Sequence, residues 1–174
     1  MKELSLNVLD IAQNSVKAGA QHLDIELSRR DGWLTIRIAD DGCGMDEAFL
    51  RSVTDPFTTT RTTRKVGMGL PLFKLAAEQT GGALSITSRQ GEGHGTTVTA
   101  TFDMNHVDCA PLGDLTGTVL TLIQGSPELS IRYRFSDGAE EKALSTDEMR
   151  EILGEDVPLN APEVLAWARE YLSE

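Results

Sequence analysis

Residues 22–41, HLDIELSRRDGWLTIRIADD, contain the pattern that decides the fold. Apolar and polar residues alternate on both sides of Asp31-Gly32, and Asp-Gly is a preferred pair for a tight turn between antiparallel strands. Strict alternation is typical of strands that bury one face. The stretch therefore predicts a β-hairpin with strands at residues 22–29 and 33–40, one face of which another layer must cover.

The segments around this hairpin predict the covering layer and the rest of the sheet. Three helices are expected. The first covers residues 3–18, a short second one directly follows GCGM, and the third covers residues 70–80 and ends before Gly81-Gly82. ALSITS and TTVTATF alternate again around the turn RQGEGHG and predict a second hairpin. Apart from the short helix after GCGM, residues 1–103 thus read α-β-β-α-β-β, an α+β fold with helices on one face of a mixed, mostly antiparallel sheet.

A C-terminal extension follows this first domain. Residues 104–174 predict two strands, TGTVLTLIQG (116–125) and ELSIRYRF (128–135), and two helices near residues 146–153 and 161–172. We therefore expect a two-layer α/β sandwich over residues 1–103 and an acidic ββαα extension over residues 104–174.

Composition and charge narrow the class of protein. The 174 residues are 40% hydrophobic and 25% charged, with a net charge of −11. Residues 1–103 carry 11 basic and 13 acidic groups, whereas residues 104–174 carry 5 and 14. This balance disfavours binding to nucleic acid or anionic membranes. No apolar run approaches the roughly 18 residues of a membrane span, and no signal peptide is recognisable, so a cytoplasmic protein with Cys43 and Cys109 as free thiols is expected.

A polar stripe lies on the first predicted helix, within DIAQNSVKAGA (10–20) and just before it. Asn7, Asp10, Asn14 and Lys17 fall within about 80° of one another on a helical wheel. An Asn carbonyl suits Mg²⁺, a carboxylate one turn earlier is a candidate base, and a lysine one turn later is a candidate phosphate ligand. Taken alone, the stripe also fits a solvated helix face.

Three further stretches carry chemistry in a fixed order. In ADDGCGM (39–45), paired glycines allow close backbone approach, and Asp40 is an acceptor suited to an amine such as that of adenine, although a plain Asp-Gly turn fits as well. DPFTTTRTTRK (55–65) suits either a flap that closes over phosphates or a simple loop. In GMGLPL (67–72), two glycines lead into a helix whose free amides form an anion site.

Together these stretches resemble the motifs of the GHKL (Bergerat-fold) ATPase superfamily. DIAQNSVKAGA resembles the N box, DDGCG the DxGxG box, DPFTTT the F box and GMGLPL the second glycine box. Residues 81–102, GGALSITSRQGEGHGTTVTATF, are similar to the closing hairpin of histidine kinase catalytic domains. The resemblance covers roughly residues 3–103 and implies a stand-alone, histidine kinase-like ATP-binding domain with the Bergerat fold.

The resemblance also implies roles for individual residues. Asn14 would bind Mg²⁺, Lys17 would contact phosphate, and Asp40 would accept the adenine amino group. The adenine side would further include Gly42, Gly44, Met45 and Thr96. The lid and phosphate side would include Phe57, Arg61, Arg64, Lys65, Gly67, Met68, Gly69 and Leu70. Asp10 stands where relatives with strong water activation carry Glu and histidine kinases often carry Asn, so hydrolysis and transfer both stay open.

We therefore expect the protein to bind Mg·ATP and to transfer the γ-phosphate to a His or Ser of a partner protein. Lys17 and the compact lid resemble histidine kinases, and no phosphoacceptor helix precedes the first motif. None of His22, His94 and His106 lies in a helical His-Glu or His-Asp context. The alternatives are a slow ATPase switch and an ATP-sensing interaction module with little catalysis.

Overall fold

The computed structural model describes residues 3–53 and 69–173, and the predicted hairpin lies at its centre. Strands β1 (His22–Arg30) and β2 (Trp33–Asp40) pair antiparallel, with Ile25 opposite Ile38. The turn residues Asp31 and Gly32 both have positive φ angles, 54° and 83°. Positive φ at both central positions is the requirement of a type I′ turn, which explains the Asp-Gly pair and confirms the predicted hairpin.

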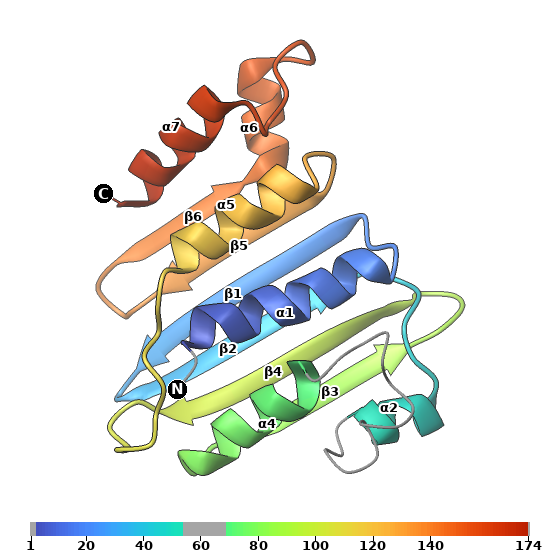
Figure 1. Cartoon of the computed structure of the whole chain (residues 1–174), viewed down its shortest axis with the longest axis vertical. Coiled ribbons are helices and arrows are strands. Elements are labelled where there is room, and N and C mark those ends of the chain that lie inside the picture. Colours follow the sequence, from blue (N-terminus) through green and yellow to red (C-terminus); the bar gives the residue numbers. More distant parts are fainter. Residues whose placement is uncertain (1–2, 54–68, 174) are drawn as a thin grey trace.

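In the described residues, six strands form one mixed sheet in the order β3-β4-β2-β1-β5-β6 (Figure 1). The remaining strands are β3 (Leu84–Arg89), β4 (Gly95–Asp103), β5 (Ser130–Ser136) and β6 (Glu141–Ser145). Only the β1–β5 pair of this sheet is parallel, and its other neighbours pair antiparallel. The predicted α+β class and the mixed, mostly antiparallel sheet are confirmed.

Helices cover one face of this sheet, as predicted. Figure 1 shows α1 (Leu4–Lys17), α4 (Gly69–Gln79) and α5 (Leu115–Gly125) lying across it. Alternate strand residues such as Leu23, Ile36 and Phe102 point into this layer and are fully buried. Phe102 packs against Phe73 of α4 with ring centroids 5.6 Å apart. Because the apolar residues of each strand share one face, the core is continuous from β3 to β6.

The expected strand at residues 116–125 is wrong, because this segment is helix α5. Its buried residues recur at helical spacing, with Leu115, Val119 and Ile123 among them. The Asp114 side chain caps the helix by accepting a hydrogen bond from the Gly117 N–H at 2.9 Å. A continuous apolar run fits a buried helix as well as a buried strand, which is why local pattern alone misassigned it.

The extension continues the same sheet. Strand β5 pairs parallel to β1, with Ile131 opposite Leu23, and β6 forms the edge beyond it. Helices α6 (Thr146–Leu153) and α7 (Pro162–Ser173) lie where two helices were predicted, and α7 packs on α5. The extension therefore contains two strands, as expected, but β6 replaces the strand that was predicted at 116–125.

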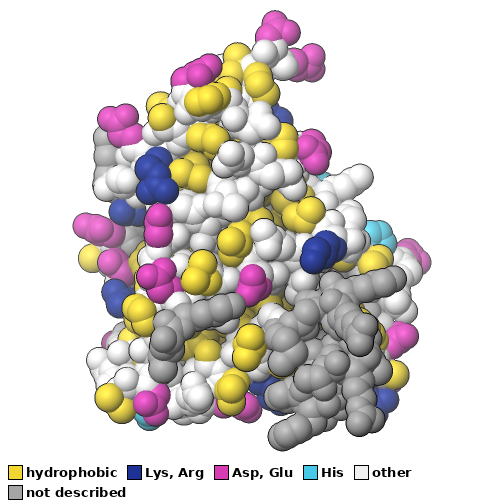
Figure 2. Space-filling view, in the orientation of Figure 1, with side chains coloured by type: hydrophobic (Ala, Val, Ile, Leu, Met, Phe, Trp, Pro, Cys, Tyr) yellow, Lys and Arg dark blue, Asp and Glu magenta, His cyan; other side chains and the backbone are white. Residues whose placement is uncertain are grey.

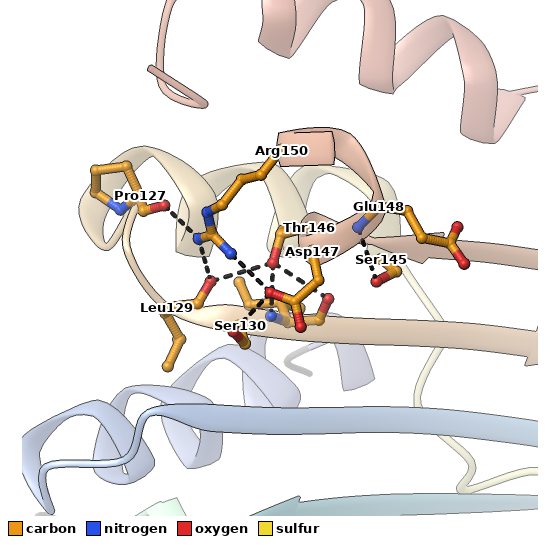
Figure 3. A network of polar contacts seen from close by, with 9 residues as sticks. Pro127, Leu129, Ser130, Ser145, Thr146, Asp147, Glu148 and Arg150 are labelled. Carbon is orange, nitrogen blue, oxygen red and sulfur yellow. Dashed lines mark hydrogen bonds and ion pairs between the residues drawn. The ribbon is translucent and has the colours of Figure 1, made fainter. Parts of the chain in front are cut away.

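A polar network holds α6 against the start of β5 (Figure 3). The buried Thr146 hydroxyl accepts a hydrogen bond from the Ile131 N–H at 2.8 Å and donates one to the Leu129 carbonyl at 3.1 Å. The Arg150 guanidinium donates to the carbonyls of Pro127 and Leu129. These bonds fix the position of α6 relative to the sheet.

Both cysteines are free thiols, as predicted. Over residues 3–53 and 69–173, no helix combines the length and apolar character needed to cross a membrane.

Candidate functional site

A cavity of about 280 Å³ lies between α1, the end of β2, the turn that follows it, and β4. Its walls are mostly apolar, with Ile11, Ile38 and Val98 among them. Among the predicted site residues, seven line it: Asn14, Lys17, Asp40, Gly44, Met45, Leu70 and Thr96. Residues from four separate motifs are thus brought together around one space.

The other predicted site residues fall into two groups. Asp10, Gly42 and Gly69 do not line the cavity but lie beside residues that do. A Cβ atom built on Gly69 would lie 3.4 Å from the Asp10 Cβ and 3.6 Å from the Asn14 Nδ2, so α4 begins against the polar stripe of α1. The remaining six lie outside the described residues: Phe57, Arg61, Arg64, Lys65, Gly67 and Met68.

The Asp40 carboxylate is held in one orientation by two hydrogen bonds. Its Oδ2 accepts from the Ser15 hydroxyl at 2.5 Å, and its Oδ1 accepts from the Gly42 N–H at 2.8 Å. A carboxylate offers about four lone-pair positions, so it can still accept a bond from a ligand amine. Sequence reasoning missed Ser15, which directly follows Asn14 and lines the cavity. Its adjacency to Asn14 is the only local signal that could have indicated it.

A pair of hydroxyl groups supports the cavity wall next to Asp40, because Thr96 of β4 lies directly opposite Asp40 in the sheet. The Thr96 and Ser88 hydroxyls are 2.8 Å apart, and Ser88 Oγ accepts a hydrogen bond from the Met45 N–H at 2.8 Å. Ser88 thereby connects β4 to the glycine-rich turn. This residue was also missed from the sequence, because it becomes a neighbour of Thr96 only when β3 and β4 pair.

Two glycines of the turn are required by internal packing. Gly44 has φ +76°, and a Cβ atom on it would lie 2.0 Å from the Arg89 carbonyl oxygen. A Cβ atom on Gly42 would lie 2.8 Å from the Ala18 Cβ. The His94 ring also contacts this turn, with its Nδ1 2.6 Å from the Gly42 carbonyl oxygen. The spacing of these glycines therefore reflects the closeness of the turn to α1 and β3.

The polar stripe of α1 is not a uniformly solvated face. Asn7 is buried, Asn14 is half-buried and Lys17 is exposed. The Asn14 Nδ2 is fully buried and has no hydrogen-bond partner among residues 3–53 and 69–173. Rotation of the amide exchanges its nitrogen and oxygen, so this site can present either a donor or an oxygen ligand. A buried unpaired polar atom is costly, which is consistent with a ligand at this position.

The second aspartate of the motif, Asp41, has a structural role. Burial by itself raises the pKa of its carboxyl group. This effect is outweighed by hydrogen bonds from the His22 N–H, the His22 ring and the Gln21 N–H and by the charge of His22, all of which lower the pKa. The resulting pKa lies below the ordinary value of 3.8. Asp41 thus ties the end of β2 to the start of β1, whereas Asp40 faces the cavity.

Residues 2–106, more than half of the chain, match the family described as histidine kinase-, DNA gyrase B-, and HSP90-like ATPase. The protein belongs to this family. The resemblance seen in the sequence is confirmed, and the chain has a nucleotide-binding domain of the GHKL type.

Known proteins similar to this chain include two bacterial sensor proteins. The tetrathionate sensor histidine kinase TtrS of Salmonella typhimurium is 44% identical over 63 residues, which are 36% of this chain and 10% of that protein. The C4-dicarboxylate transport sensor protein DctS of Rhodobacter capsulatus is 34% identical over 98 residues, which are 53% of this chain and 15% of that protein. The chain therefore aligns with only a small part of each sensor.

A solved structure shares the fold. The crystal structure of the N-terminal domain of a DNA repair protein matches with a TM-score of 0.58 at 16% sequence identity. The match covers 89% of this chain and 58% of that domain structure. At this level of identity the similarity extends to the fold alone. It includes most of the chain, so the aligned region reaches beyond residues 2–106.

Proposed function

We propose that the cavity binds Mg·ATP and that the protein transfers the γ-phosphate to a His or Ser residue of a partner protein. The observation that supports this most directly is the Asp40 carboxylate, which the Ser15 hydroxyl holds in one orientation among apolar walls. The buried, unpaired Asn14 Nδ2 lies on the same helix as Ser15. An apolar slot with one oriented acceptor matches a purine ring that carries an exocyclic amine.

The phosphate side of the proposed site is formed by α1 and the start of α4. Asn14 would provide an oxygen ligand for Mg²⁺, and the first turn of α4, next to it, offers the positive end of a helix. Lys17, which also lines the cavity, is exposed and supplies a positive charge. In the described residues no three His, Cys, Asp or Glu side chains cluster as a metal site, which fits a cation held mainly by phosphate oxygens. Bound Mg²⁺ would neutralise phosphate charge.

Transfer to a partner is supported by the positions of the three histidines. His22 bonds to Asp41, His94 contacts the Gly42 carbonyl, and the His106 Nδ1 accepts from the Asp108 N–H at 3.0 Å. In each contact the ring uses Nδ1, and none of the three histidines lines the cavity. The acceptor is therefore proposed to come from another protein. That partner protein would become phosphorylated on a His or Ser residue.

One observation favours hydrolysis as a second candidate. Asp10 lies one helical turn before Asn14 and next to the start of α4, where a carboxylate could orient water near the phosphates. Because its side chain is one methylene shorter than Glu, it reaches less far than the glutamate found in relatives with strong water activation.

Single-turnover reactions with γ-labelled ATP test these functions. The protein is incubated with Mg·ATP, with and without proteins that copurify with it. Label on a partner protein supports the kinase, and release of free phosphate alone identifies an ATPase switch. Intact nucleotide binding with neither product identifies an ATP-sensing module. The Asp40→Asn protein serves as the control: at an ATP concentration below saturation, product made at this site should fall with the lower ATP affinity, whereas product formed at an unchanged rate comes from elsewhere.

A further inference from the structure

Helix α7 carries a stripe of acidic and aromatic residues on its outer side. Glu163, Trp167, Glu170 and Tyr171 are all exposed and fall within about 100° of one another at 3.6 residues per turn. We call these four residues the acidic–aromatic stripe. Trp167 and Tyr171 stack, with ring centroids 5.3 Å apart and planes inclined by 19°, and remain 46% and 50% exposed.

The adjoining side of α7 holds this stripe in place. Val164, Ala168 and Leu172 are buried against the core. Arg169 pairs with Asp114 at the start of α5, at 3.3 Å. The stripe therefore lies on a helix that is fixed to the rest of the protein, and its two rings present a pre-arranged surface.

The surroundings of the stripe are strongly acidic. Residues 146–173 contain seven acidic and only two basic residues. The two basic residues are Arg150, engaged by Asp147 and backbone carbonyls, and Arg169, paired with Asp114. Figure 2 shows acidic side chains around the end of the molecule where α6 and α7 lie. Within the described residues, no internal cation neutralises the stripe.

We propose that the acidic–aromatic stripe docks an arginine-rich segment of a partner protein. A planar guanidinium can stack on the exposed faces of Trp167 and Tyr171 while its N–H groups donate to Glu163 or Glu170. A lysine ammonium is a compact, strongly hydrated charge and matches this combination less well. The surface lies in the extension, so its use as a docking site does not depend on the nucleotide cavity.

The test uses the whole protein and acetylated, amidated tetra-arginine as the probe, with binding measured by isothermal titration calorimetry at low salt. Saturable binding is expected, about threefold or more tighter than for tetra-lysine, with no binding of tetra-glutamate. Trp167→Leu and the double variant Glu163→Gln/Glu170→Gln should each weaken binding by about three- to fivefold.

Two matched controls separate the stripe from general charge and exposure. Glu148→Gln/Glu151→Gln removes the same charge from α6, and Trp33→Leu replaces a tryptophan of similar exposure, 43%, on β2. Each control should change affinity by less than about twofold. Equal losses in stripe and control variants, equal affinity for tetra-lysine, or absence of binding would each overturn the proposal. Asp40→Asn should leave peptide binding unchanged, so a failure of the nucleotide site is recognised separately.

Discussion

The Ser15 hydroxyl donates a hydrogen bond to the Asp40 Oδ2 at 2.5 Å and so joins α1 to the end of β2. The two residues are 25 positions apart in the chain. The Gly42 N–H holds the other carboxylate oxygen at 2.8 Å. The direction in which Asp40 faces the cavity is therefore set by the packing of a helix on the sheet and by the turn after β2.

Replacing Asp40 by Asn should reduce ATP affinity about 10- to 100-fold or abolish it, because an amide offers one acceptor where the carboxylate offers two. Isothermal titration with ATP measures the effect. Asp41→Asn is the matched control, since Asp41 bonds to the start of β1. Unchanged affinity in Asp40→Asn would contradict the adenine assignment.

Removing the Ser15 hydroxyl tests the positioning of Asp40. Ser15→Ala should weaken ATP binding about five- to tenfold, because one bond that orients the carboxylate is lost. Ser5→Ala is the control: Ser5 is equally buried on α1 and its hydroxyl faces Glu3. The free energy of unfolding should fall by a similar amount, about 1 kcal/mol, in both variants. Equal nucleotide affinity in the two proteins would argue against a positioning role.

Gly44→Ala should lower the free energy of unfolding by about 2–5 kcal/mol, from left-handed strain and a clash with the Arg89 carbonyl. Gly91 has nearly the same φ, +77°, but nothing lies within 4 Å of an added Cβ atom. Gly91→Ala should therefore cost only about 1–2 kcal/mol. Urea unfolding of both variants measures the difference, and equal costs would show that the close approach of Arg89 is unimportant.

Asp41 should make stability depend on acid. The pKa of its carboxyl group is lowered in the folded protein from the ordinary 3.8, so folding favours the ionised form. This contribution is complete above about pH 5 and is lost as pH falls through 3.8 toward the lower folded-state pKa. Urea unfolding between neutral pH and pH 3 should show the wild-type advantage over Asp41→Asn shrinking in that window. A constant difference across the series would disagree with this assignment.

Thr146→Val should destabilise the protein by about 1–3 kcal/mol, because the buried Ile131 N–H loses its acceptor while the side-chain shape is retained. Ser130→Ala removes an exposed hydroxyl that bonds Asp147 in the same network. It should change stability by no more than about 0.5 kcal/mol. Thermal or urea unfolding distinguishes the two, and a Thr146→Val protein as stable as Ser130→Ala would contradict the burial argument.

Much of the fold could be predicted because it is encoded locally. The Asp31-Gly32 turn needs positive φ at both positions, and the alternation around it defines the buried face of β1 and β2. Strand β6 escaped prediction because Glu141-Lys142 opens a short, largely polar edge strand. Helix α5 was misassigned because its apolar run satisfies both patterns, and the cap at Asp114 was not recognised.

The sequence by itself determined the order of the motifs, the elements that carry them, and hence the family. The tertiary structure decided which side chains meet: Ser15 with Asp40, Ser88 with Thr96, and β5 alongside β1. Periodicity and turn chemistry depend on residues a few positions apart, so a sequence displays them directly. Contacts between distant residues arise only when strands pair and helices pack, and no local pattern records their partners.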